Sequence, residues 1–323
     1  MAMLYPPIEP YADGMLDVGD GNAIAWEMSG NPDGKPALVL HGGPGSGRST
    51  STRRFFDPDV YNIILFDQRG CGESTPHASD PDCDMTVNTT AHLIADMENL
   101  RAYVGVDRWL VFGHSWGCTL ALAYAEEHPE EVAALVLVGV TTCRQSEIDW
   151  LYRGIAPLFP EAWERFRAGV SKAERNGDLV AAYHRRLNDP DEAVCHKAAS
   201  DWHDWEGSLS ADPGAALSEA WADPRFRLAR ARIITHYFHH AAWLSKNQIL
   251  CGAHALAGIP GVMVQGRLDL EAPLMTAWDL AKVWPSGDLV IVPNAGHGVS
   301  EAGMGEAITA ATDRFAADQG IWS

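Results

Sequence analysis

The 323-residue chain lacks several features that define large classes of proteins. Nowhere do eighteen apolar residues follow one another, so the sequence predicts no membrane-spanning helix. Residues 1–13 contain prolines and have no basic segment followed by an apolar one, which is not the pattern of a secretory signal peptide. We therefore expect a soluble protein of the cytoplasm.

Basic side chains are scarce relative to acidic ones. Lys and Arg number 24 against 43 Asp and Glu, and the formal net charge is −19 at pH 7. A surface this acidic repels phosphate backbones and anionic lipid head groups, so we expect neither nucleic acid nor a membrane as a partner. The apolar fraction of 46% and the charged fraction of 21% are ordinary for a globular protein and exclude a disordered chain.

Metal-ligand and disulfide patterns are also missing. The six cysteines include no C-x-x-C pair and have no spacing typical of zinc ligands or of a disulfide framework. His236, His239 and His240 have helical spacing, but no carboxylate or cysteine completes a ligand set. We expect no metal and no cofactor, and the sequence makes no prediction of an oligomeric state.

Short apolar runs alternate with helical patterns along the chain. Residues 90–104 and 116–128 predict amphipathic helices, the first capped by a residue within 88–90 and the second ending before Pro129. Seven apolar runs predict strands, and several are apolar throughout, as in a sheet covered on both faces. These runs are residues 23–28, 37–40, 61–66, 109–112, 134–138, 261–264 and 289–292.

The stretch between about residues 141 and 251 has a different character. It has no convincing strand, contains six of the twelve tryptophans, and is broken into short helices by Pro157, Pro160, Pro190, Pro213 and Pro224. An insertion of this length between consecutive strands is typical of a cap over one edge of a sheet. We expect an α/β core formed by residues 1–140 and 251–323, and a helical cap formed by residues 141–250.

The segment Gly113-His114-Ser115-Trp116-Gly117 lies directly between a predicted strand and a predicted helix. A G-x-S-x-G nucleophile elbow requires that setting, because the sharp turn holds the serine in strained geometry and the glycines remove steric clashes. Ser115 is therefore the predicted nucleophile.

A nucleophilic serine needs a base, and the base needs a third group to orient it. In hydrolases built on this elbow the acid and then the histidine follow the serine along the chain. Asp269 and His297 lie in loops that follow the last two predicted strands, where ligand sites of α/β sheets are found. Glu271, two residues beyond Asp269, is the alternative acid, and we expect Asp269 to fill the role.

The loop His41–Gly47 is rich in glycine and follows the strand at residues 37–40. Such a loop lets backbone N–H groups approach a substrate oxygen, and we expect the oxyanion donors to be Gly43 and Trp116. A phosphate-binding loop is the alternative, but no G-x-x-x-x-G-K-[ST] pattern is present. The charged pair of the neighbouring segment Asp67–Gly72 is expected to brace this loop rather than contact substrate.

Together, His41–Gly47, Asp67–Gly72, the elbow with its continuation to Ala125, and the Asp269 and His297 loops resemble the proline iminopeptidases of the α/β-hydrolase superfamily. The similarity extends from about Tyr5 to Phe315. The resemblance implies a mostly parallel, about eight-stranded sheet flanked by helices, with a helical cap. It also implies a metal-free serine hydrolase that releases an N-terminal residue, typically proline, from small peptides, amides or esters.

In that family two glutamates of the cap hold the amino end of the substrate. The resemblance assigns one of them to Glu206, beside Trp202 and Trp205, and we expect all three to line the substrate pocket. The other falls in the segment 231–238, which brings Ile234 and Tyr237 to the pocket, but Ile234 replaces the glutamate.

A cysteine that follows the catalytic Asp in many members is here Ala272. Fewer carboxylates weaken selection for a charged amine. The alternative is therefore an esterase, amidase or acyl transferase with a different acyl specificity. A catalytically silent binding protein is a third possibility, and the presence of Ser115, Asp269 and His297 argues against it.

Overall fold

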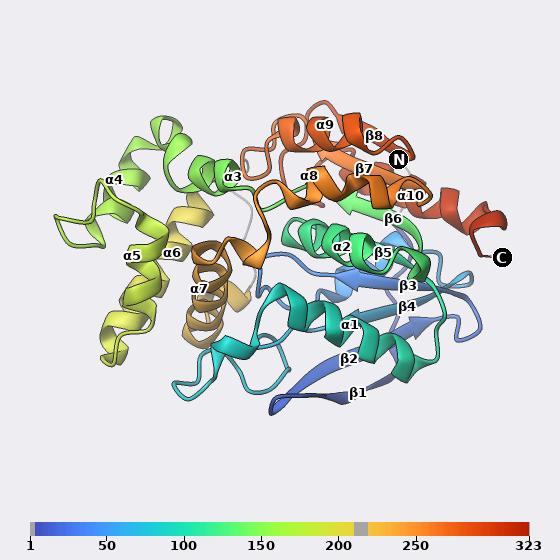
Figure 1. Cartoon of the computed structure of the whole chain (residues 1–323), viewed down its shortest axis with the longest axis horizontal. Helices are drawn as coiled ribbons and strands as arrows, with labels where there is room; N and C mark the ends of the chain where they lie inside the picture. Colours follow the sequence, from blue (N-terminus) through green and yellow to red (C-terminus); the bar gives the residue numbers. More distant parts are fainter. Residues whose placement is uncertain (1–3, 210–218, 323) are drawn as a thin grey trace.

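The computed structural model describes residues 4–209 and 219–322, so Pro213 lies outside the described residues. Its centre is an eight-stranded sheet with the strand order β1-β2-β4-β3-β5-β6-β7-β8 (Figure 1). β2 is antiparallel to its neighbours β1 and β4, and all other pairs are parallel. The strands are β1 (Pro10–Gly19), β2 (Asn22–Gly30), β3 (Lys35–Leu40), β4 (Tyr61–Phe66), β5 (Trp109–His114), β6 (Val132–Val138), β7 (Gly261–Gly266) and β8 (Gly287–Val292).

Seven of these strands contain the seven predicted apolar runs, which confirms those predictions. β1 is absent from the predicted set because it has no continuous apolar run. It is an edge strand that begins at a proline, and its exposed side chains, such as Tyr11 and Met15, alternate with half-buried ones. Only one face of such a strand is covered, so its composition resembles that of a loop.

Helices cover both faces of the sheet. On β3, Leu38 and Leu40 belong to one hydrophobic cluster, whereas Ala37 and Val39 belong to the other, as the alternation of a pleated strand requires. The first cluster includes side chains of α1 (Thr90–Val104), α2 (Trp116–Glu127), α8 (Gln248–Gly252) and α9 (Leu274–Val283). The second includes α10 (Met304–Ala317) and a 3-10 turn, η1 (Thr50–Phe55).

The two predicted helices have the expected ends. The Thr89 hydroxyl accepts the N–H of His92 and caps α1, and Gly105 ends that helix in the left-handed conformation. α2 ends at Glu127, two residues before Pro129, and has its C-cap at His128. No helix in the described part of the chain is both long and apolar enough to cross a bilayer.

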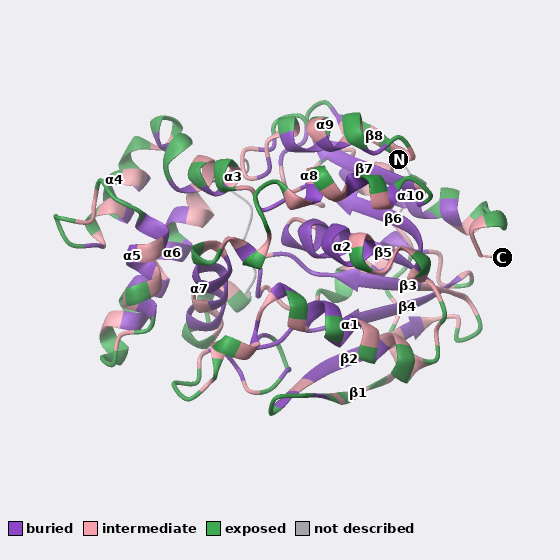
Figure 2. Cartoon of the chain, viewed as in Figure 1, coloured by how far each residue is buried: buried purple, intermediate pink, exposed green. Residues whose placement is uncertain are grey.

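Between β6 and β7 the chain forms a group of helices that lies beside the sheet, on the left in Figure 1. We call these the inserted helices: α3 (Gln145–Asp149), α4 (Pro160–Ala168), α5 (Leu179–Leu187), α6 (Glu192–Ser208) and α7 (Pro224–His239). The described residues of this segment include no strand. Their facing sides are buried (Figure 2), and Phe166 packs there in a stack on Tyr183, with ring centroids 4.5 Å apart.

Candidate active site

Ser115 lies in the tight turn from β5 to α2. Its backbone has φ 56° and ψ −122°, a conformation that L-residues adopt only under strain. A Cβ atom added to Gly113 would overlap the Gly117 carbonyl, and one added to Gly117 would overlap the Leu40 carbonyl. The two glycines are therefore required by close backbone packing, and the turn presents the serine side chain to a cavity.

Asp269 and His297 are joined directly. Nδ1 of His297 lies 2.8 Å from Oδ2 of Asp269, and this oxygen also accepts a hydrogen bond of 2.9 Å from Nε2 of Gln265. The other carboxylate oxygen accepts the N–H groups of Glu271 and Ala272, at 3.0 and 2.7 Å. Asp269, and not Glu271, thus makes the hydrogen bond to the imidazole.

The loop that carries His297 is held by Glu301. Its two carboxylate oxygens accept the N–H groups of Gly296 at 2.6 Å and of Gly298 at 2.9 Å, on either side of the histidine. Gly139 makes room for the ring, since a Cβ there would lie 2.9 Å from Cε1 of His297. Among the described residues no hydrogen bond joins Ser115 Oγ to His297. Both side chains border the same cavity, and such bonds often tighten only in the substrate complex.

The glycine loop lies against the elbow. Gly43 has φ 115° and borders the cavity, and a Cβ on it would lie 2.7 Å from the amide nitrogen of Gly45. Trp116, the first residue of α2, borders the same cavity, and N–H groups at a helix start carry partial positive charge. The structure thus brings Gly43, Trp116 and Ser115 to one cavity.

Asp67 connects to this loop as expected, and Gln68 does so as well. Gln68 donates to the carbonyl of His41 at 3.2 Å and accepts the indole N–H of Trp116 at 2.9 Å. Asp67 accepts the N–H of Arg48 at 2.6 Å. Arg69, the other member of the charged pair, does not brace this loop. It pairs with Asp96 on α1 at 2.7 Å instead.

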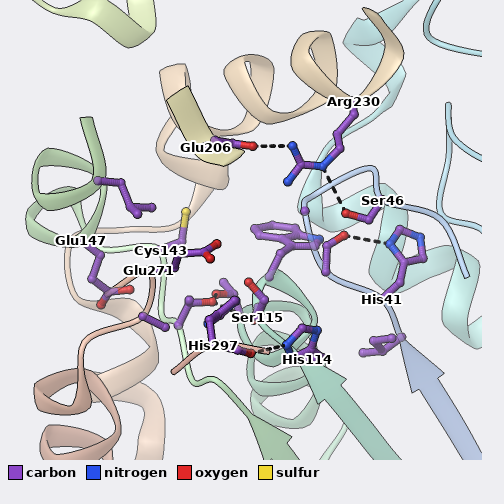
Figure 3. A pocket seen from close by; sticks show the side chains of 18 of the residues that line it. His41, Ser46, His114, Ser115, Cys143, Glu147, Glu206, Arg230, Glu271 and His297 are labelled. Atoms are coloured by element: carbon purple, nitrogen blue, oxygen red, sulfur yellow. Dashed lines mark hydrogen bonds and ion pairs between the residues drawn. The ribbon is translucent and has the colours of Figure 1, made fainter. Parts of the chain in front are cut away.

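The cavity has a volume of about 310 Å³ and lies between the strand-end loops and the inserted helices. Figure 3 shows Ser115 and His297 at one end of it, and Glu206 and Arg230 at the other. Glu147 and Glu271 also line its wall. The cavity is therefore large enough for a small acyl group, and charged side chains surround it.

Glu206 is fully engaged by the protein. One carboxylate oxygen accepts the hydroxyl of Tyr152 at 2.8 Å and the indole N–H of Trp202 at 2.9 Å. The other oxygen forms an ion pair with Arg230 on α7. Burial alone would raise the pKa of the Glu206 carboxyl, but Arg230 and these hydrogen bonds outweigh it and hold that pKa below its usual range. Glu206 is thus ionised, and its charge is offset inside the protein.

Of the five residues predicted to contact substrate, the described structure places Glu206 on the cavity wall and does not bring the other four to it. Trp202 lies behind Glu206, and Trp205 donates to the carbonyl of Leu151 at 3.1 Å. Tyr237 donates to Asn88 at 2.8 Å. Ile234 is fully buried on α7, one turn from Arg230, which does line the cavity.

The neighbouring histidines His297 and His114 have pKa values shifted in opposite directions. Burial lowers the pKa of His297, but Asp269, Glu271 and Glu301 outweigh it and raise that pKa above its ordinary value. Burial, together with the positive charge of His297, lowers the pKa of His114 to about 4. His114 is therefore neutral near pH 7. The pKa of the Glu271 carboxyl is raised, chiefly by burial.

Two groups of described side chains have atoms close enough together to share a metal ion: His41, Asp67 and Cys71, and Glu98, His128 and Glu131. The first group is engaged in the glycine loop, where His41 Nε2 accepts the N–H of Gln68 at 3.1 Å and the thiol of Cys71 donates to the Gln68 carbonyl. In the second, Glu98 accepts hydrogen bonds from Arg101 and Tyr124. These contacts engage His41 and Cys71 in the first group and Glu98 in the second.

Four residues around the cavity are not among those predicted from the sequence: Gln265, Glu301, Arg230 and His114. Gln265 and Glu301 do carry a local signal, since each lies four residues from the Asp269 or His297 that it supports. Arg230 carries none, because its partner Glu206 lies 24 residues away on another helix.

Comparisons with known proteins agree with this architecture. Residues 35–303 match the family described as the alpha/beta hydrolase fold. A probable proline iminopeptidase of Streptomyces coelicolor is 52% identical over 97% of this chain and 98% of its own length. The proline iminopeptidase of Xylella fastidiosa is 48% identical over 98% of this chain and all of its own length. The proline iminopeptidase of Arabidopsis thaliana is 45% identical over 98% of this chain and 83% of its own length.

Among solved structures, the proline iminopeptidase of Mycobacterium smegmatis is similar in fold, with a TM-score of 0.61 at 18% identity over 94% of this chain and 97% of its own. A hydrolase from Pseudomonas aeruginosa has a TM-score of 0.65 at 17% identity over 95% and 99%. The fold and the relatives define the class of the protein. The chain belongs to the proline iminopeptidases of the α/β-hydrolase fold family.

Proposed function

We propose that this chain is a serine hydrolase that releases an N-terminal residue, proline or a close analogue, from small peptides, amides or esters. The observation that carries the proposal is the arrangement at the cavity: Ser115 in a strained elbow, with His297 beside it and hydrogen-bonded to Asp269 at 2.8 Å. The activity named for relatives at 45–52% identity over nearly the whole chain supports the same reaction.

In the proposed mechanism, Ser115 Oγ attacks the carbonyl carbon of the N-terminal residue, and Nε2 of His297 accepts its proton. Asp269 accepts a hydrogen bond from the Nδ1–H group of His297. This bond leaves Nε2 unprotonated, so that it can act as the base, and it stabilises the imidazolium that forms. The N–H groups of Gly43 and Trp116 donate to the oxyanion. His297 then protonates the leaving amine or alcohol. In the second half of the reaction, His297 takes a proton from a water molecule that attacks the acyl carbonyl carbon, and it then returns the proton to Ser115 Oγ as the acid leaves.

We further propose that residues 141–250 act as a cap that closes the acyl side of the cavity. The support is that Glu147, Tyr152, Glu206 and Arg230 all come from this segment and line the cavity. Glu206 and Arg230 lie at the end away from Ser115 (Figure 3). A cap over the strand-end loops excludes water and limits the size of the residue that can reach the serine.

The test compares hydrolysis of a prolyl naphthylamide with that of N-acetylprolyl naphthylamide and of a simple ester without an amine. We expect the free amine substrate to have the highest kcat/KM. Ser115→Ala should lose activity on all substrates by at least about ten-thousand-fold and should not be labelled by a fluorophosphonate. Activity restricted to substrates without a free amine would contradict the aminopeptidase and favour the esterase. Failure of the unmodified chain to hydrolyse or to be labelled would contradict both.

A further inference from the structure

Among the described residues, three carboxylates line the cavity, and they differ in what they contact. Glu147 accepts hydrogen bonds from the N–H and hydroxyl of Thr142 at 2.9 and 2.6 Å and from Nε of Arg144 at 2.7 Å. Glu206 is engaged by Tyr152, Trp202 and Arg230 as described above. The charges of both residues are therefore compensated by the protein itself.

Glu271 is the third carboxylate and has neither hydrogen bonds nor an ion pair of this kind. Across residues 4–209 and 219–322, no hydrogen-bond donor or ion-pair partner contacts its side chain. Its backbone is held firmly, because its N–H donates to Asp269 at 3.0 Å. Glu271 is half-buried on the cavity wall. A carboxylate in this position without a hydrogen-bond or ion-pair partner attracts a cation, so the cavity favours a ligand with a positive charge.

The Glu271 carboxylate lies where it could contact the amino group of a substrate whose carbonyl carbon is attacked by Ser115. In Figure 3 its carboxylate projects into the pocket between Ser115 and Glu206. It is close enough to His297, Glu206 and Arg230 to interact with each of them electrostatically. The α-amine of an N-terminal residue is separated from the reacting carbonyl carbon by a single carbon atom, so a carboxylate on the wall next to the serine can reach it.

We propose that Glu271 is the residue that binds the protonated amine of the substrate, while Glu206 and Arg230 form a neutral pair that shapes the far wall. This inference rests on the proposed function and assigns its specificity to one side chain. The residue at position 234 is an isoleucine that is fully buried, so α7 supplies no carboxylate there. The carboxylate comes instead from the loop after β7, directly beside the predicted catalytic acid.

The first test is Glu271→Gln, which keeps the shape and removes the charge. A hydrogen-bonded ion pair shielded from water predicts a loss of about ten- to hundred-fold in kcat/KM for prolyl naphthylamide, mainly as a higher KM. On a simple ester without an amine, measured at the pH of maximal activity, the loss should be less than about threefold. The matched control is Glu147→Gln, a carboxylate of the same cavity that already has partners, and it should not change the ratio of the two activities.

The second test removes the pair on the far wall. Glu206→Gln alone would leave Arg230 uncompensated and would repel an amine, so the informative variant is Glu206→Gln with Arg230→Met. We expect this double variant to keep the preference for the amine substrate over the ester. A lost preference here, with none lost in Glu271→Gln, would overturn the inference and assign the amine to Glu206.

These outcomes are distinct from failure of the proposed function. If the unmodified chain hydrolyses prolyl naphthylamide and Glu271→Gln does so equally well, only the assignment of Glu271 is wrong. If the unmodified chain prefers substrates without an amine, the proposed function itself is wrong. A double variant that does not fold, as judged by circular dichroism, leaves Glu271→Gln with its ester control to decide.

Discussion

The two sides of the cavity are built in different ways. On the sheet side, each residue of the predicted triad is held by contacts within its own loop or the strand before it: Ser115 by the turn of the elbow, Asp269 by Gln265, and His297 by Glu301. On the side of the inserted helices, some of the contacts that position cavity residues join distant parts of the chain. Tyr152 and Glu206 lie 54 residues apart, and Arg230 and Ser46 lie 184 residues apart.

This difference separates the chemistry from the choice of substrate. A substitution on α6 or α7 changes which group the far wall can bind, but it does not touch the hydrogen bonds that orient Asp269 and His297. Glu271 is the exception, because it lies in the loop of the predicted catalytic acid and its side chain points into the cavity. The comparison therefore predicts strong effects of sheet-side variants on every substrate, and selective effects elsewhere.

The largest effect is expected from Asp269→Asn. The carboxylate accepts four hydrogen bonds, and an amide in its place would point its own N–H groups at some of these donors. An amide N–H next to Nδ1 of His297 also favours the tautomer with the proton on Nε2, which cannot act as the base. We expect kcat to fall about ten-thousand-fold on amine and ester substrates alike. The measurement is steady-state kinetics on both.

Its control is Asp288→Asn, an exposed carboxylate of β8 that pairs with Arg314 away from the cavity. This control should retain full activity. A loss confined to amine substrates in Asp269→Asn would break the proposed division between the two sides.

The same division explains how much could be predicted from the sequence. Ser115, Asp269 and His297 lie in short motifs at strand ends, so apolar runs locate the strands and the topology of a parallel sheet brings the loops together. Of the eight strands, only the edge strand β1 is not predicted, because its alternating, half-exposed side chains lack an apolar run.

The far wall could not be predicted in the same way. Glu206, which the resemblance assigns to the substrate pocket, lines the cavity, but nothing in the sequence near it indicates Arg230, which comes from α7. Trp202, Trp205, Ile234 and Tyr237 are close in sequence to cavity residues, yet helix packing turns them into the interior. On a helix the neighbour of a cavity residue commonly faces another direction, whereas a tight loop exposes most of its residues.

A second prediction concerns stability and tests whether the inserted helices form a separate unit. Phe166 packs against Tyr183, Trp202 and Trp205, at centroid distances between 4.5 and 5.7 Å. Phe166→Ala should cost about 3–5 kcal/mol of unfolding free energy. If residues 141–250 form their own cooperative unit, hydrogen exchange should accelerate in α4–α7 and stay slow in β5 and β6.

The matched control is Phe112→Ala on β5, whose ring stacks on Phe55 in the core of the sheet. This variant should accelerate exchange in the sheet. Equal acceleration throughout the chain in Phe166→Ala would show that the inserted helices and the sheet unfold as one, and would contradict the proposed cap unit.

The smallest expected effect is a shift in the pH dependence of kcat/KM. It concerns Glu271, which lies in the loop of the predicted catalytic acid and also points into the cavity. The charged groups facing His297 are Asp269, Glu271 and Glu301, which raise its pKa. The ring of His114 lies beside that of His297 in a tilted arrangement, with ring centroids 5.1 Å apart, and is neutral near pH 7. Because His297 must be neutral to accept the proton of Ser115, kcat/KM falls as the pH falls through the pKa of His297.

Glu271→Gln removes one of the three charges that raise this pKa, so the acidic limb of kcat/KM on a simple ester should move to lower pH. The maximal rate on that ester should change little, since Asp269 still orients the imidazole. Glu147→Gln should leave the limb in place, because Glu147 is not among the groups that shift His297. A limb that moves to higher pH, or moves equally in both variants, would mean that Glu271 does not act on the base. A shift on the ester together with a lost amine preference would show that one side chain couples the two sides of the cavity.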